Sequence, residues 1–80
     1  MNNPTREAII ERKILEYLEM SLLSIMDAIN EADASNYTEN FIDDLKDMQQ
    51  KIEWKIAIVN GNLGSWEQQA IALLRASSRT

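Results

Sequence analysis

Two apolar seams of equal length most constrain what this chain can fold into. Each seam spans 17 residues and repeats at alternating steps of three and four, the pattern of one helix packed along another. The first consists of Leu15, Leu18, Leu22, Ile25, Ile29 and Ala32, and the second of Ile42, Leu45, Gln49, Ile52, Ile56 and Val59. Folding the chain between the seams brings together residues whose numbers sum to 74. The pattern therefore predicts an all-α fold built on an antiparallel hairpin of two long helices.

Capping residues predict where the two long helices begin. Pro4 suits the first helical position, with Asn3 as its cap, and nothing breaks a helix over about residues 4–32. Thr38 is a plausible cap for the second helix, and Asn36, with Glu39 three residues later, is an alternative. The second helix is expected to cover about residues 38–60.

The segment after residue 60 reads as a turn followed by a third, short helix. Gly61 is a typical residue just beyond a helix end, and Ser65 with Gln68 has the spacing of a capping box. We expect a third helix over about residues 65–76, covering the part of the first helix that extends beyond its seam. The whole chain, residues 1–80, is expected to form one helical domain.

Gln49 is the polar member of the second seam. If it is buried, it needs hydrogen-bond partners and could set the register of the hairpin. The alternative, which we favour from the sequence, is that Met48 takes the core position and Gln49 turns outward.

Large apolar residues also lie beside the seams, at Leu23 and Met26 in the first helix and at Trp54 and Ile58 in the second. A helix that is apolar on a second face is usually packed on two sides. We therefore expect the hairpin to assemble into a dimeric or higher helical bundle, with a monomer as the alternative.

The composition excludes several classes of function. The chain has no Cys and no His, which removes disulfides, thiol chemistry, zinc sites of the usual type and every catalytic triad built on His. No uncharged stretch approaches the roughly 20 residues that span a bilayer, and the mixed-charge N-terminus is unlike a signal peptide. The expected location is the cytoplasm.

Charge is concentrated in one region of the chain. The net charge is −5, and one lysine, Lys46, lies among the seven acids of the central region. Binding to nucleic acid or to an anionic membrane is disfavoured, because both need a basic face. We expect a charged recognition surface for a protein partner with a basic surface. It consists of Asp27, Glu31, Asp33, Glu39, Asp43, Asp44 and Asp47.

An alternative site would bind a small, nucleotide-like anion at a subunit junction near the open end of the hairpin. Aromatic residues are common binding anchors, and basic residues lie near them in the predicted hairpin. The candidate residues are Tyr17, Arg12, Lys13, Trp54, Lys55, Trp66 and Arg75.

Catalysis and metal binding have little support in the sequence. Acidic pairs such as Asp43 and Asp47 read as a solvated face, and the spacing of a calcium loop is missing. The two glycines of residues 60–65 precede a predicted helix, but the phosphate-binding motifs that use such glycines are absent. We expect no catalytic residue, no metal and no cofactor.

Two resemblances bear on function. The paired seams over residues 4–60 resemble, in architecture, the helical hairpins that dimerise into four-helix bundles in plasmid copy-number regulators of the Rop type. The tail sequence Ile-Ala-Leu-Leu-Arg-Ala at residues 71–76 is similar to the C-terminal helix of small helical phage proteins that sequester cyclic nucleotides. The expected function is that of a non-enzymatic, oligomeric regulator or inhibitor of phage or plasmid type.

Overall fold

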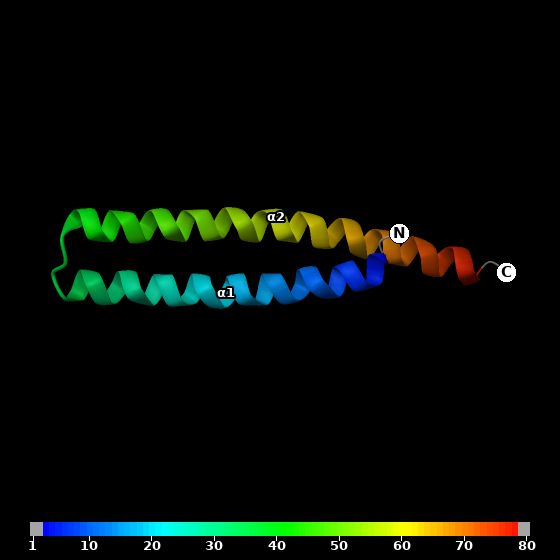
Figure 1. Ribbon diagram of the computed structural model, residues 1–80, viewed down its shortest axis with the longest axis horizontal. Coiled ribbons are helices and arrows are strands. Elements are labelled where there is room, and N and C mark those ends of the chain that lie inside the picture. Colours follow the sequence, from blue (N-terminus) through cyan, green and yellow to red (C-terminus); the bar gives the residue numbers. More distant parts are fainter. Residues whose placement is uncertain (1–2, 79–80) are drawn as a thin grey trace.

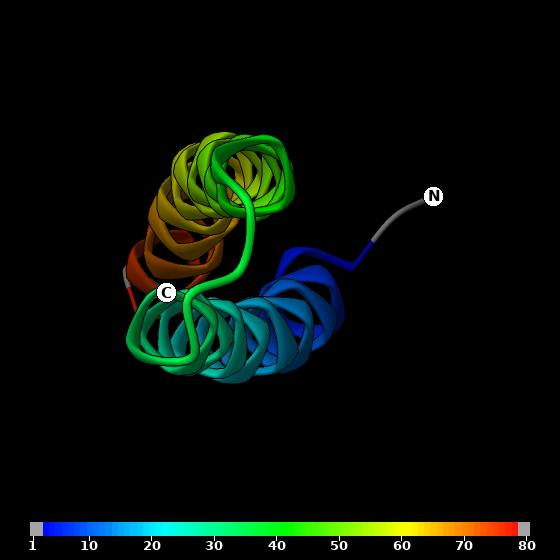
Figure 2. The same cartoon turned by 90° about the vertical axis from the view of Figure 1, so that its left-hand side faces the viewer.

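The computed structural model describes residues 3–78, which form a hairpin of two antiparallel helices. Helix α1 covers Pro4–Ala34 and helix α2 covers Glu39–Ser78, and residues 35–38 join them at one end (Figure 1). The hairpin is a rod of 66 × 17 × 14 Å with a radius of gyration of 18.4 Å. A compact chain of this length would have a radius of gyration of about 12 Å. Viewed end-on, the two helices wind around each other (Figure 2).

The helix starts follow the capping residues. The Asn3 side-chain oxygen accepts hydrogen bonds from the backbone N–H groups of Thr5 and Arg6, at 3.0 and 3.3 Å, and Pro4 is the first helical residue. At the start of α2, the Thr38 hydroxyl accepts from the Phe41 N–H at 3.3 Å, so Thr38 and not Asn36 is the cap. Asn36 instead has a φ of 60° in the turn, the left-handed conformation that Asn tolerates.

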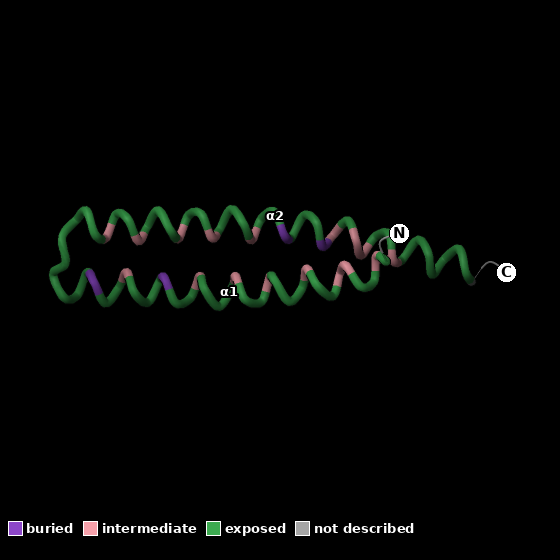
Figure 3. Tube along the Cα trace, in the orientation of Figure 1, coloured by how far each residue is buried: buried purple, intermediate pink, exposed green. Residues whose placement is uncertain are grey.

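Both predicted seams lie between the helices. Every seam residue is buried or half-buried, and the positions shielded from solvent line the facing sides of α1 and α2 (Figure 3). The buried core is nevertheless small. Among the described residues it consists of Ile25, Ala32, Val59 and Leu63, which are 6 to 9% exposed.

The predicted third helix is wrong as a separate element, because α2 continues without a break to Ser78. Neither Gly61 nor Gly64 has a positive φ, so neither leaves the helix as a C-terminal glycine would. The physical reason is the seam, which continues in step after Val59 with Leu63, Trp66 and Ala70. Ending the helix at Gly61 would expose Leu63, which is 7% exposed here.

The extended α2 covers the N-terminal part of α1. The rule that paired residues sum to 74 places Glu11 near Leu63, Ala8 near Trp66 and Pro4 near Ala70, and all six are buried or half-buried. Beyond Ala70, α2 overhangs the start of α1 (Figure 1). The prediction that a third helix covers residues 5–14 is therefore wrong in its element. The continuous α2 half-buries Ala8 and Glu11, whereas Ile9, Ile10 and Ile14 stay exposed.

Gln49 lies on the seam, contrary to the favoured alternative in which Met48 takes this position. Gln49 is half-buried, whereas Met48 is 50% exposed. The Gln49 side-chain amide donates to a carboxylate oxygen of Glu53 at 3.1 Å, one turn further along α2. Glu53 is exposed, so the amide reaches a partner at the edge of the seam. In the described part of the chain, no buried side-chain nitrogen or oxygen atom lacks a hydrogen-bond partner.

Candidate functional site

The heptad register divides the flanks of the hairpin into two contrasting sides. Seven of nine seam-flanking positions are charged on one side, which we call the charged side, and two of nine on the other, which we call the apolar side. The charged side consists of Arg12, Glu19, Met26, Asp33, Glu39, Lys46, Glu53, Asn60 and Glu67. The apolar side consists of Glu7, Ile14, Ser21, Ala28, Phe41, Met48, Lys55, Asn62 and Gln69.

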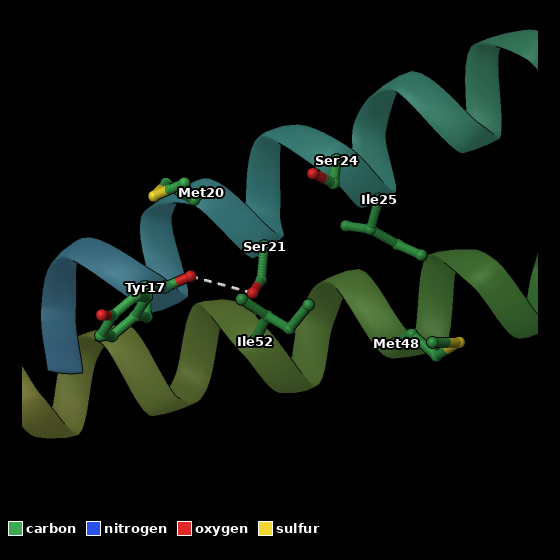
Figure 4. A pocket seen from close by; sticks show the side chains of 7 residues that line it. All are labelled: Tyr17, Met20, Ser21, Ser24, Ile25, Met48 and Ile52. Carbon is green, nitrogen blue, oxygen red and sulfur yellow. Dashed lines mark hydrogen bonds between the residues drawn. The ribbon is translucent and has the colours of Figure 1, made fainter.

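A groove lies on the apolar side, near the middle of the rod. It is open, has a volume of about 530 Å³ and is formed by both helices (Figure 4). The Ser21 hydroxyl donates to the Tyr17 backbone carbonyl at 2.9 Å, so it is satisfied within α1 and the groove is mainly apolar. Its lining residues are Tyr17, Met20, Ser21, Ser24, Ile25, Met48 and Ile52.

A second groove, of about 310 Å³, lies on the same side, next to the turn. The rings of Tyr37 and Phe41 contact each other there, with centroids 4.8 Å apart. The lining residues are Ala28, Glu31, Ala32, Ser35, Tyr37, Phe41 and Leu45. Together, the two grooves follow the apolar side from the turn to the middle of the rod.

The seven predicted acidic residues gather at the turn end of the hairpin, and all are exposed. Within residues 3–78, Asp47 alone among them has an ion pair, with Lys51 at 3.2 Å. Glu31 and Asp44 border the apolar side, because each lies three residues after a position of that side. These positions are Ala28 in α1 and Phe41 in α2. The remaining five point to the charged side or to the backs of the helices.

The residues of the predicted small-ligand site do not converge within one chain. Trp66 lies on the seam, whereas Trp54 is 61% exposed on the back of α2. Arg12 is paired with Glu67 on the charged side, and Tyr17 lines the groove near the middle of the rod. Lys13, Lys55 and Arg75 are exposed at separate places along the rod. A ligand site at a subunit junction stays a prediction.

Metal and membrane chemistry gain no site from the described residues. Among residues 3–78, no group of three or more acidic side chains is arranged to hold a metal ion, and neither α1 nor α2 contains a stretch long and apolar enough to cross a bilayer. No protein family, curated protein or solved structure matches this chain.

The apolar side was missed as a unit by sequence reasoning. Leu23 and Met26, which suggested a second apolar face, lie on the flank that carries the charged side, whereas Ile58 borders the apolar side. The sequence does contain a signal for this side. Once the two seams are aligned, the flanking positions can be counted, and seven are charged on one side but two on the other.

Proposed function

We propose that this protein is a non-enzymatic interaction module that self-associates into a helical bundle and binds another protein. One observation carries the first half of the proposal. In the described part of the chain four apolar residues are buried, whereas fifteen large hydrophobic side chains are at least 41% exposed. A hairpin with so small a core is marginal as a monomer.

Self-association offers a large stabilisation. Burying one large apolar side chain contributes roughly 1.5–3 kcal/mol. Four residues on or beside the apolar side, Ile14, Phe41, Met48 and Ile58, are about half exposed, so burying the remainder would together contribute roughly 3–6 kcal/mol per chain. That amount is a large fraction of the whole stability of a small domain.

Native mass spectrometry and light scattering on the full chain test this half of the proposal. We expect a homo-oligomer at micromolar concentration and a melting temperature that rises with protein concentration. A monomer whose melting temperature is independent of concentration would contradict self-association.

The acidic turn end supports the second half of the proposal, a protein partner with a basic surface. Its carboxylates are exposed and, apart from Asp47, have no cationic partner within residues 3–78. Such a surface steers and selects a basic partner through electrostatic complementarity. A regulator or inhibitor of phage or plasmid type would use it to cover a basic surface on its target.

Affinity capture from host lysate tests the acidic surface. Reversal of Asp43 and Asp47 to Lys should abolish capture of a specific partner, because both lie away from the apolar side. The matched control reverses Glu16 and Glu19, which carry the same charge in the middle of α1. Equal capture by both variants and the unmodified chain would contradict a role for the acidic turn end.

A further inference from the structure

We propose that a second copy of this chain docks on the apolar side with its turn pointing in the opposite direction. The resulting four-helix bundle would have its twofold axis near Ser24 of α1, at the level of Gln50 of α2. This inference rests on the proposed self-association and specifies its face and orientation.

The face follows from the cost of desolvating charge. Docking on the charged side would remove seven charged positions per chain from water, whereas the apolar side carries two, Glu7 and Lys55. Both grooves lie on the apolar side and are lined mainly by apolar groups. An isologous contact, in which the same face is used twice, requires such a self-complementary surface.

The area reaches the level expected of a specific interface. With an axis near Ser24, the two faces overlap from the turn of one copy to the turn of the other, about 33 Å at 1.5 Å per residue. With the 17 Å width of the hairpin, this overlap covers roughly 560 Å² per chain, or about 1,100 Å² in total, and a specific interface needs about 1,000 Å². The overlap contains both grooves.

Two face-to-face orientations are possible, and they bring different helices together. If both turns lie at the same end, symmetry stacks α1 of one copy on α2 of the other. If the turns lie at opposite ends, α1 stacks on α1 and α2 stacks on α2. Charge and side-chain size decide between these orientations.

Charge disfavours turns at the same end. Glu31 and Asp44 lie at the same level of the hairpin and both border the apolar side. With the turns together, Glu31 of each copy would face Asp44 of the other, and like charges placed opposite each other suppress association. With the turns apart, these carboxylates are separated from their symmetry mates.

Opposite orientation instead pairs Asp44 with a lysine. Asp44 lies six residues before Gln50, and Lys55 lies five residues after it. The twofold axis therefore brings Asp44 of each copy to Lys55 of the other, twice per dimer. Tyr17 of one α1 comes to the level of Glu31 of the other, where its hydroxyl can donate to the carboxylate.

Side-chain sizes agree with this orientation. The α1 surface around the axis is formed by small residues, with Ser24 on the axis and Ser21 opposite Ala28 of the second copy. Small residues let two helices approach closely. On α2, by the same symmetry, Phe41 comes to the level of Ile58 of the second copy, and both are about half exposed in the single chain.

Single-cysteine cross-linking tests both the face and the orientation, because the chain has no native Cys. Ser24→Cys should form an intermolecular disulfide under mild oxidation, since the two copies meet at the axis. Ser35→Cys should not form this disulfide, since residue 35 of one copy would lie about 33 Å from residue 35 of the other along the bundle, at 1.5 Å per residue. Leu23→Cys, one residue away on the flank of α1 that carries the charged side, is the matched control and should also stay unlinked.

A charge-swap series gives an independent measurement. Asp44→Lys and Lys55→Asp should each raise the dimer dissociation constant on the order of tenfold or more, and the double swap should restore most of the affinity. Asp43→Lys makes the same change one residue away, off the apolar side, and should leave the dissociation constant within about threefold of the original, as expected for an exposed charge.

Each other outcome overturns the inference. A dimer that links through Leu23→Cys uses the wrong face. A dimer that loses affinity with Asp44→Lys but is not restored by the double swap has the wrong orientation, as does one that does not link through Ser24→Cys. A chain that stays monomeric overturns the proposed self-association itself, which separates the two failures.

Discussion

Arg12, in the third turn of α1, forms an ion pair with Glu67 of α2, 55 residues further along the chain. The pair lies on the charged side and connects the N-terminal part of α1 to the segment of α2 beyond both glycines. The pair fits an α2 that continues in register past Gly64, because a helix that ended at Gly61 and restarted would not keep Glu67 aligned with Arg12.

We expect this ion pair to contribute little to stability. The two side chains are 60% and 42% exposed, and exposed pairs contribute roughly 0.2–1 kcal/mol. A double-mutant cycle of Arg12→Ala and Glu67→Ala in urea denaturation should return a coupling energy in that range. High salt should reduce the coupling, and a value that salt does not change would contradict a screened surface pair.

Leu63 should be a stability residue of the helix continuation. It is 7% exposed on the extended seam, so Leu63→Ala should lower the free energy of unfolding by roughly 2–4 kcal/mol. Leu74, which is 71% exposed on the overhang, is the matched control, and Leu74→Ala should cost less than about 0.5 kcal/mol. Equal effects in urea denaturation at fixed protein concentration would contradict the continuous seam.

The two glycines should be replaceable by alanine with a gain in stability. Both are helical, and a Cβ added at Gly61 or Gly64 would have no neighbour within 4 Å. Each Gly→Ala change should therefore raise the free energy of unfolding by about 0.5–1 kcal/mol. Calorimetry at matched concentration measures the gain.

Proline provides the opposite test at the same position. Gly61→Pro should lower the free energy of unfolding by about 3 kcal/mol or more, because it removes a helix hydrogen bond and clashes with the preceding turn. If Gly61→Pro were tolerated and Gly61→Ala were destabilising, residue 61 would lie in a turn, as the sequence alone suggests.

Gln49 should limit the stability of the hairpin. It is half-buried on the seam, at the level of buried Ile25, and its amide is satisfied by Glu53 at the edge. Gln49→Leu should raise the free energy of unfolding by about 1 kcal/mol, since an apolar side chain gains burial without leaving a partner buried. The control is Gln50→Leu at an exposed position, which should change stability by less than about 0.5 kcal/mol in urea denaturation.

The sequence by itself determined the hairpin. The two 17-residue seams, the Asn3 and Thr38 caps and the turn between them follow from local chemistry and from a repeat that can be counted. The repeat can be interpreted from the sequence because it places apolar residues on one face of each helix, and two seams of equal length joined by a short turn pair in one antiparallel register.

Only the tertiary structure decided the conformation of residues 61–78 and the position of Gln49 on the seam. Gly61, Gly64 and Ser65 carry strong local signals for a helix end, yet the helix continues because stopping it would expose Leu63 and Trp66 to water. Two helical glycines cost about 2 kcal/mol relative to alanine, which is of the order of what one buried leucine returns. Gln49 stays on the seam for a related reason, since rotating α2 to bury Met48 would displace every other seam residue. Both outcomes depend on the partner helix, whose contribution no local window of sequence contains.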